Sequence, residues 1–120
     1  NHPLTARCGR LWAVDGVWVV PRLWRYELWS VLSKMVWAKF LRPNDAEPLY
    51  QSLLERLGDN EQDPPASSVF ALTSRHRVSA YDATYIALAD LLGVPCVTED
   101  RELLSKFPKI AVSLDAILAK

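Results

Sequence analysis

Hydrophobic residues recur along the first half of the chain at spacings that predict helices separated by a turn and a short strand. Helices are expected over 3–12, 21–42 and 45–57, and a short apolar strand over 17–20 follows a turn signal at 15–16. In the longest of these helices, five apolar residues at helical spacing predict a buried stripe, namely Trp24, Leu28, Val31, Leu32 and Met35. The first half is therefore predicted to be mainly helical.

The second half of the chain alternates helices with short strands. A polar, turn-rich loop is expected over 58–65. Ser79 is expected to start the most strongly patterned helix, and Gly93 to stop it. The other expected elements are helices over 69–75, from about Asp100 and over 114–118, and strands over 94–97 and 110–112. Strands separated by helices pair in parallel, so the pattern predicts an α/β layered fold.

The composition fits one globular domain over residues 1–120. Half of the residues are hydrophobic, which excludes a disordered tail, and 14 basic residues balance 14 acidic ones. This balance argues against a protein that coats nucleic acid through excess positive charge, but it allows a local RNA-binding patch.

Cys8 and Cys96 lack a paired spacing, so we expect reduced, buried thiols. No apolar run approaches the ~18 residues that cross a bilayer and no signal peptide opens the chain, so a cytoplasmic protein without a membrane partner is expected.

Three acidic residues lie where a purely structural sequence seldom places them. Glu27 falls on the flank of the buried stripe of its helix. Asp82 shares a helix face with inward-pointing residues, and Asp100 follows the carboxyl end of a predicted strand, where α/β proteins bind ligands. Each position also has a structural interpretation. Glu27 suits a surface glutamate paired with Arg25 or Lys34, and Asp82 and Asp100 suit helix caps.

Taken together, the three acids favour a metal site. Clustered carboxylates repel one another unless a cation neutralises them, and an all-oxygen site without nearby His or Cys favours Mg²⁺ or Mn²⁺. The chemistry typical of such a site is phosphodiester hydrolysis by a metal-bound water. Glu27, Asp82 and Asp100 are therefore the candidate catalytic residues and metal ligands.

The most distinctive motifs resemble the PIN domain, and among PIN domains the VapC-type toxins of bacterial toxin–antitoxin pairs. The resemblance lies in the run 79–89, followed by Leu92-Gly93 and by Val97-Thr98-Glu99-Asp100. The earlier segment 21–32 is similar to the second acidic motif of that family. The similarity extends over nearly the whole chain and is most specific from Asp82 to Asp100.

The resemblance implies a three-layer αβα fold with a central parallel sheet. It also implies Mg²⁺- or Mn²⁺-dependent cleavage of RNA, homodimers, and inhibition by a cognate antitoxin protein. Carried over position by position, Glu27, Asp82 and Asp100 match the metal-binding acids, and Thr98 matches a hydroxyl position that orients the site. PIN domains open with a strand that ends in an aspartate, before the helix that here starts near Pro3. We therefore expect an N-terminally truncated chain that lacks this strand and its acid.

Other interpretations stay open at this point. A degenerate PIN fold that binds a protein and cleaves nothing would explain a missing first acid, and a response-regulator-like domain also gathers acids at strand ends. Five tryptophans could stack on RNA bases, although core or dimer packing is favoured for Trp12, Trp18, Trp24, Trp29 and Trp37. The segment 75–77, Arg-His-Arg, suits either phosphate contacts or a solvated loop.

Overall fold

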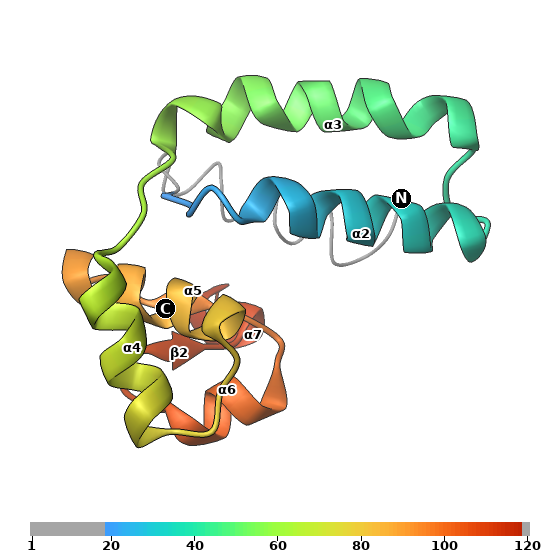
Figure 1. Ribbon diagram of the computed structural model, residues 1–120. Coiled ribbons are helices and arrows are strands. Elements are labelled where there is room, and N and C mark those ends of the chain that lie inside the picture. The colour runs from blue at the N-terminus through green and yellow to red at the C-terminus, as the bar shows by residue number, and fades with distance from the viewer. Residues whose placement is uncertain (1–18, 119–120) are drawn as a thin grey trace. The chain divides into compact units, whose positions relative to one another are not determined.

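The computed structural model describes residues 19–118, in which helices predominate over short strands (Figure 1). Contacts divide the chain after Glu61 into two compact units, residues 1–61 and 62–120. Each unit has its own internal packing, and the single domain predicted over residues 1–120 stays a prediction. The helix predicted over 3–12 lies outside the described residues.

The first unit is built on a pair of helices, α2 (Trp24–Trp37) and α3 (Pro43–Leu57), which lie side by side in Figure 1. The prediction of two helices here is confirmed, with α3 beginning two residues earlier than expected. Pro43 occupies the first turn of α3, where the amide hydrogen that proline lacks would have no helical partner. A short 3-10 turn, η1 (Gly58–Asn60), follows α3.

The buried side of α2 differs from the predicted stripe. Trp24 and Leu32 are buried, but Val31 is 51% exposed. Two tryptophans expected in a core or dimer contact also reach the surface, because Trp29 is 51% and Trp37 76% exposed. Trp12 and Trp18 lie outside the described residues.

Glu61, at the end of the first unit, forms hydrogen bonds with residues at the start of α2. Its carboxylate accepts hydrogen bonds from the indole of Trp24 at 2.7 Å and from Arg25 Nε at 2.5 Å. The Arg25 hydrogen bond holds the pKa of Glu61 below its ordinary value. Glu61 also forms an isolated parallel bridge with Val20. Of the strand predicted over 17–20, the described residues retain only this bridge.

The second unit alternates helices and strands as predicted. Its elements are α4 (Ala66–Arg75), α5 (Ala80–Leu92), β1 (Cys96–Val97), α6 (Arg101–Lys106), β2 (Ala111–Val112) and α7 (Leu114–Leu118). The two strands pair in parallel, with Cys96 opposite Ala111. Both strands are shorter than expected, and α4 begins three residues early. The helices and the small parallel sheet confirm the α/β class.

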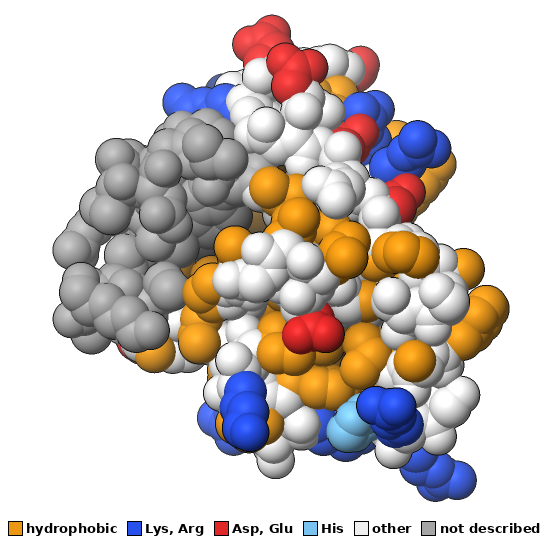
Figure 2. Space-filling model, turned by 90° about the vertical axis from the view of Figure 1, so that its left-hand side faces the viewer, with side chains coloured by type: hydrophobic (Ala, Val, Ile, Leu, Met, Phe, Trp, Pro, Cys, Tyr) orange, Lys and Arg blue, Asp and Glu red, His pale blue; other side chains and the backbone are white. Residues whose placement is uncertain are grey.

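A compact core holds the second unit together. Ile86 from α5 packs with Leu103 and Phe107 from the α6 region and with Ala111 from β2. Apolar side chains also reach the surface of the molecule, where Figure 2 shows them among charged groups. Within residues 19–118, no helix combines the length and the apolar character that crossing a membrane requires.

Candidate functional site

Asp82 lies in the first turn of α5, which Ser79 caps. The Ser79 hydroxyl accepts a hydrogen bond from the Asp82 amide at 3.0 Å, as the predicted cap requires. The Asp82 side chain is half-buried, which confirms that it does not point freely into solvent. At the far end of α5, Gly93 adopts a left-handed conformation and stops the helix as expected. Local capping thus fixes the helix that carries Asp82.

Asp100 caps α6 and is itself positioned by Thr98. Its Oδ1 atom accepts hydrogen bonds from the amides of Glu102 at 2.9 Å and Leu103 at 3.1 Å. The Thr98 hydroxyl accepts from the Asp100 amide at 3.0 Å. The capping interpretation of Asp100 is therefore confirmed. Its Oδ2 atom accepts no hydrogen bond from the described part of the chain, so capping and metal binding are compatible.

The acids at the start of α6 act on Asp82 in α5. The pKa of Asp82 is raised above its ordinary 3.8, first by burial and then by the negative charge of Asp100. The Ser79 hydroxyl opposes this shift, and Glu102 adds to it. Asp100 and Glu102 therefore lie close enough for their charges to act on Asp82, and we call these three residues the acidic region. Glu102 was not among the residues predicted from the sequence, although it lies two residues after Asp100 in the same helical turn.

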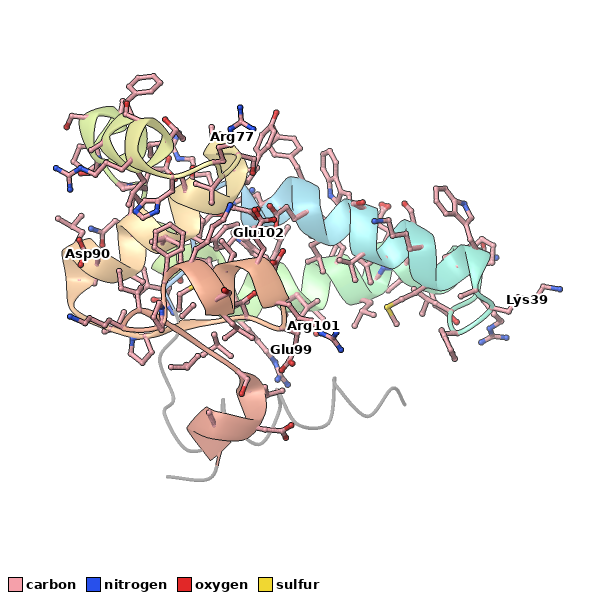
Figure 3. All side chains as sticks on the ribbon, turned by 90° about the horizontal axis from the view of Figure 1, so that it is seen from below. Lys39, Arg77, Asp90, Glu99, Arg101 and Glu102 are labelled. Atoms are coloured by element: carbon pink, nitrogen blue, oxygen red, sulfur yellow. The ribbon has the colours of Figure 1, made fainter. Side chains whose placement is uncertain are left out.

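Glu99 and Cys96 lie close to the acidic region along the chain. Glu99, labelled with Arg101 and Glu102 in Figure 3, accepts a hydrogen bond from the Leu114 amide at 3.0 Å at the start of α7. Cys96 is a free, half-buried thiol, as predicted, and Cys8 lies outside the described residues. Burial, together with the charge of Asp82, raises the pKa of Cys96 to about 11. The thiol is therefore protonated at neutral pH in the metal-free chain.

Glu27 belongs to the other unit, in the first turn of α2, where its side chain is exposed. Among the residues from 19 to 118, no group of three or more His, Cys, Asp or Glu side chains is placed to hold a metal ion. The structure thus relates Asp82 to Asp100 but does not test whether Glu27 joins them. Their convergence into one metal site stays a prediction.

The groups near Asp82 fit a hard divalent cation better than a soft one. Asp82 and Asp100 offer carboxylate oxygens, whereas a carboxylate oxygen of Glu102 accepts a hydrogen bond from Lys106. Oxygen donors of this kind suit Mg²⁺ and Mn²⁺ rather than zinc. No Lys or Arg pairs with Asp82 or Asp100 among the described residues, so their charge is left without a compensating protein cation.

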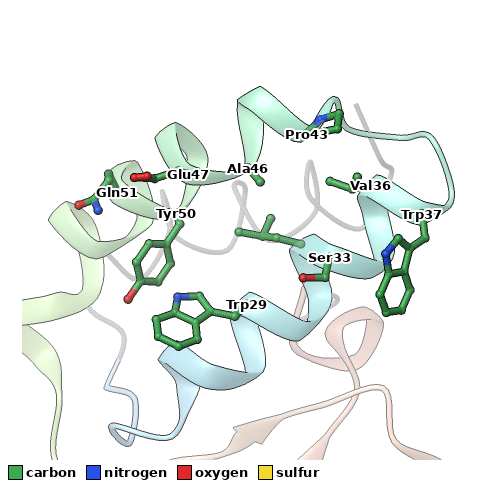
Figure 4. Close-up of a pocket in the computed structure, with 10 residues that line it drawn as sticks. Trp29, Ser33, Val36, Trp37, Pro43, Ala46, Glu47, Tyr50 and Gln51 are labelled. Carbon is green, nitrogen blue, oxygen red and sulfur yellow. The ribbon is translucent and has the colours of Figure 1, made fainter.

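A separate groove lies between α2 and α3 in the first unit (Figure 4). It encloses about 540 Å³, and its walls include Trp29, Val36, Trp37 and Tyr50. The rings of Trp29 and Tyr50 meet edge to face, with their centroids 5.8 Å apart. Its lining is mainly apolar, with no cluster of titratable groups, so it resembles a binding surface more than a reaction centre.

Comparisons with known proteins identify the family of the chain. The PIN domain family matches residues 1–110. Ribonuclease VapC3 of Pyrobaculum aerophilum is 34% identical over 88 residues, which cover 71% of this chain and 67% of that protein. Exonuclease VapC9 of the same organism is 36% identical over 59 residues, which cover 49% of this chain and 44% of that protein.

A solved structure shares the fold. The crystal structure of PAE2754 from Pyrobaculum aerophilum superimposes with a TM-score of 0.65 and 30% sequence identity, and the match covers 84% of this chain and 74% of that one. The family match spans most of the chain and includes the capped Asp82 helix and the Thr98–Asp100 turn. The chain belongs to the PIN-domain family.

Proposed function

We propose that this chain is a Mg²⁺- or Mn²⁺-dependent endoribonuclease and the toxin of a toxin–antitoxin pair. The observation that carries the proposal is the placement of two acids at capped helix starts within the PIN family match, Asp82 in the first turn of α5 and Asp100 at the start of α6. Both acids lie at capped helix starts, where the charge of Asp100 also repels the ionised carboxylate of Asp82. A divalent cation removes that repulsion, and RNA cleavage is a chemistry that such a cation supports.

In this proposal Asp82 and Asp100 hold the metal ion, and Glu27 from α2 completes its set of acids. When bound, the ion polarises the phosphate and lowers the pKa of a water molecule. The protein's own contribution is rigid placement. Ser79 fixes the turn that carries Asp82, and the Thr98 hydroxyl fixes the backbone of Asp100. Asp100 keeps one oxygen on two amides, which holds its other oxygen in place.

The relatives support a nuclease and leave its mode of attack to be tested. One is named a ribonuclease and another an exonuclease. By the same resemblance we propose that a cognate antitoxin protein inhibits this chain. We further propose that the protein acts in the cytoplasm as a homodimer.

The decisive experiment compares Asp82→Asn with Asp90→Asn, which removes an exposed acid from the same helix (Figure 3). Each protein is incubated with a linear and a circularised RNA in Mn²⁺, Mg²⁺ or EDTA. We expect metal-dependent opening of the circle by the unchanged chain and by Asp90→Asn. The Asp82→Asn variant should lose at least about a hundredfold in rate, because a metal-bound water supplies most of the reactivity. Equal cleavage by Asp82→Asn refutes the proposed site, and cleavage of linear RNA alone refutes the endonuclease.

A second function, an inactive PIN-like module that binds a protein, is favoured by the groove between α2 and α3. Trp29 and Trp37 are exposed there, as at many protein interfaces. Calorimetric titration with Mn²⁺ separates the two functions. A nuclease should bind Mn²⁺ in the unchanged chain and lose affinity in Asp82→Asn, whereas an inactive binding module should bind Mn²⁺ equally weakly in both.

A further inference from the structure

The loop between α4 and α5 carries two exposed arginines that the proposed metal site does not use. Arg75 is the last residue of α4, and Arg77 lies between His76 and the Ser79 cap of α5. Within residues 19–118 neither arginine has an acidic partner. An arginine without a partner keeps its full hydrogen-bonding capacity for a ligand.

Hydrogen bonds fix the backbone around Arg77. The Val78 amide donates to the His76 carbonyl at 2.9 Å, which closes a three-residue turn with Arg77 at its centre. From α6, Lys106 Nζ donates to the Arg77 carbonyl at 2.7 Å and to Glu102 Oε1 at 2.5 Å. The turn is therefore held from its own ends and from the neighbouring helix.

The flanking residues anchor the same loop to the core. The His76 amide donates to the Leu72 carbonyl at 2.9 Å, which ends α4, and the His76 ring lies edge-on to Phe107 with centroids 4.7 Å apart. Val78 and Leu72 pack against the buried cluster around Phe107. The side chain of Arg77 thus projects from a fixed base, so less backbone ordering is needed when it binds a ligand.

The anchored turn lies beside the candidate metal site. Lys106 links Arg77 directly to Glu102, and Glu102 is one of the acids that raise the pKa of Asp82. Arg77 and Glu102 lie at the same end of the second unit in Figure 3. In Figure 2 a Lys or Arg side chain lies directly beside the pale-blue histidine. The loop that carries the exposed Arg75 and Arg77 is thus joined through Lys106 to the helix that carries Glu102.

We propose that Arg75 and Arg77 bind the phosphate backbone of single-stranded RNA and hold it against the Asp82 region. The identity of the ligand rests on the proposed function. If RNA reaches the acidic region, these acids repel the polyanion unless cations such as Arg75 and Arg77 lie nearby. Arginine is suited to this task, since its planar guanidinium binds phosphate oxygens in pairs. In a chain of zero net charge, such a local patch is the means by which RNA is gripped.

The test measures RNA binding apart from cleavage. A fluorescently labelled single-stranded RNA is titrated in EDTA, at several salt concentrations, with the 120-residue chain and two double variants. One variant is Arg75→Gln with Arg77→Gln. The matched control is Lys34→Gln with Arg56→Gln, which removes the same charge from exposed positions on α2 and α3.

We expect the arginine variant to bind about tenfold more weakly at low salt, and its slope of log affinity against log salt to fall by about 1.4, since each single-strand phosphate contact contributes about 0.7. The control should keep the affinity and the slope of the unchanged chain. Equal weakening in both variants, or no RNA binding by the unchanged chain, overturns the inference.

A kinetic measurement separates this inference from the proposed nuclease. In Mn²⁺, Arg77→Gln should raise KM for RNA while kcat changes less than about twofold, as expected when uniform substrate binding is lost. An unchanged KM contradicts the arginine contact and leaves the nuclease standing. RNA binding that depends on the arginines, without cleavage under any condition, contradicts the nuclease and supports the RNA contact.

Discussion

At the scale of single residues, Asp82 combines a structural position with an electrostatic cost. Its amide satisfies the Ser79 cap, while its carboxylate is half-buried and near Asp100 and Glu102. Both burial and neighbouring negative charge disfavour the ionised form. The proposed metal site needs the ionised carboxylate of Asp82, whereas the metal-free fold is more stable when this side chain is protonated.

This conflict predicts how Asp82→Asn changes stability with pH in EDTA. Because the folded state raises the pKa of Asp82 above 3.8, the protonated carboxyl stabilises the fold below that value, and the benefit is lost as pH rises through the folded pKa. Asparagine stays neutral at every pH. The melting temperature of Asp82→Asn minus that of the unchanged chain should therefore be larger at pH 7 than at pH 3.5, a range of ~3.5 pH units that brackets the titration of carboxyl groups.

Thermal unfolding followed by circular dichroism gives this comparison. At 1 M salt the part of the difference due to Asp100 and Glu102 should shrink, since the Debye length falls to about 3 Å, while the part due to burial remains. A difference in melting temperature that does not vary with pH would contradict the raised pKa.

At the scale of elements, capping decides where the helices begin and end. Ser79 and Gly93 delimit α5, and Asp100 begins α6. Gly93 has φ +66°, where glycine is favoured, whereas Gly58 at the end of α3 has φ −59° and ψ −33°, which any residue adopts. A Cβ atom at either position would meet nothing within 4 Å, so the backbone alone distinguishes them.

Alanine substitutions at these two glycines should therefore have opposite effects. Gly93→Ala forces a left-handed conformation on a residue with a Cβ, and should cost about 1 kcal/mol of unfolding free energy. Gly58→Ala restricts the unfolded chain at a compatible position, and should add about 0.5 kcal/mol. Urea unfolding midpoints measure both, and each variant is the control for the other. If both variants change the free energy of unfolding in the same direction, the backbone conformation of these glycines does not determine the effect of alanine.

At the scale of the whole molecule, the question is whether the two units contribute to one metal site. Asp82 and Asp100 lie in the second unit and Glu27 in the first. Metal binding by the folded chain raises its stability by mass action, about 2.7 kcal/mol when the free ion exceeds its Kd a hundredfold. Shared ligands would make this stabilisation depend on acids from both units.

We predict that Mn²⁺ raises the melting temperature of the unchanged chain and raises it less in Glu27→Gln and Asp82→Asn. Loss of one carboxylate ligand removes part of the charge that binds the ion. Glu55→Gln, an exposed acid on α3, is the control and should respond as the unchanged chain does. A full response in Glu27→Gln would remove Glu27 from the site and confine metal binding to the second unit.

The sequence by itself determined the features that depend on neighbours along the chain. The helix at Ser79, its stop at Gly93 and the cap at Asp100 follow from hydrogen bonds that span only a few residues, so local patterns predicted them. The alternation of helices and short strands can also be read along the chain, and it predicted the α/β class and the parallel pair because strands separated by helices pair in parallel.

Tertiary structure alone decided the features that join distant segments. Glu61 binds Trp24 and Arg25 across more than thirty residues, and Lys106 reaches back to the Arg77 carbonyl. No local pattern encodes such contacts. The exposure of Val31 and the charge of Glu102 acting on Asp82 likewise depend on which surfaces meet, because burial and Coulomb energy are set by proximity in space rather than by position along the chain.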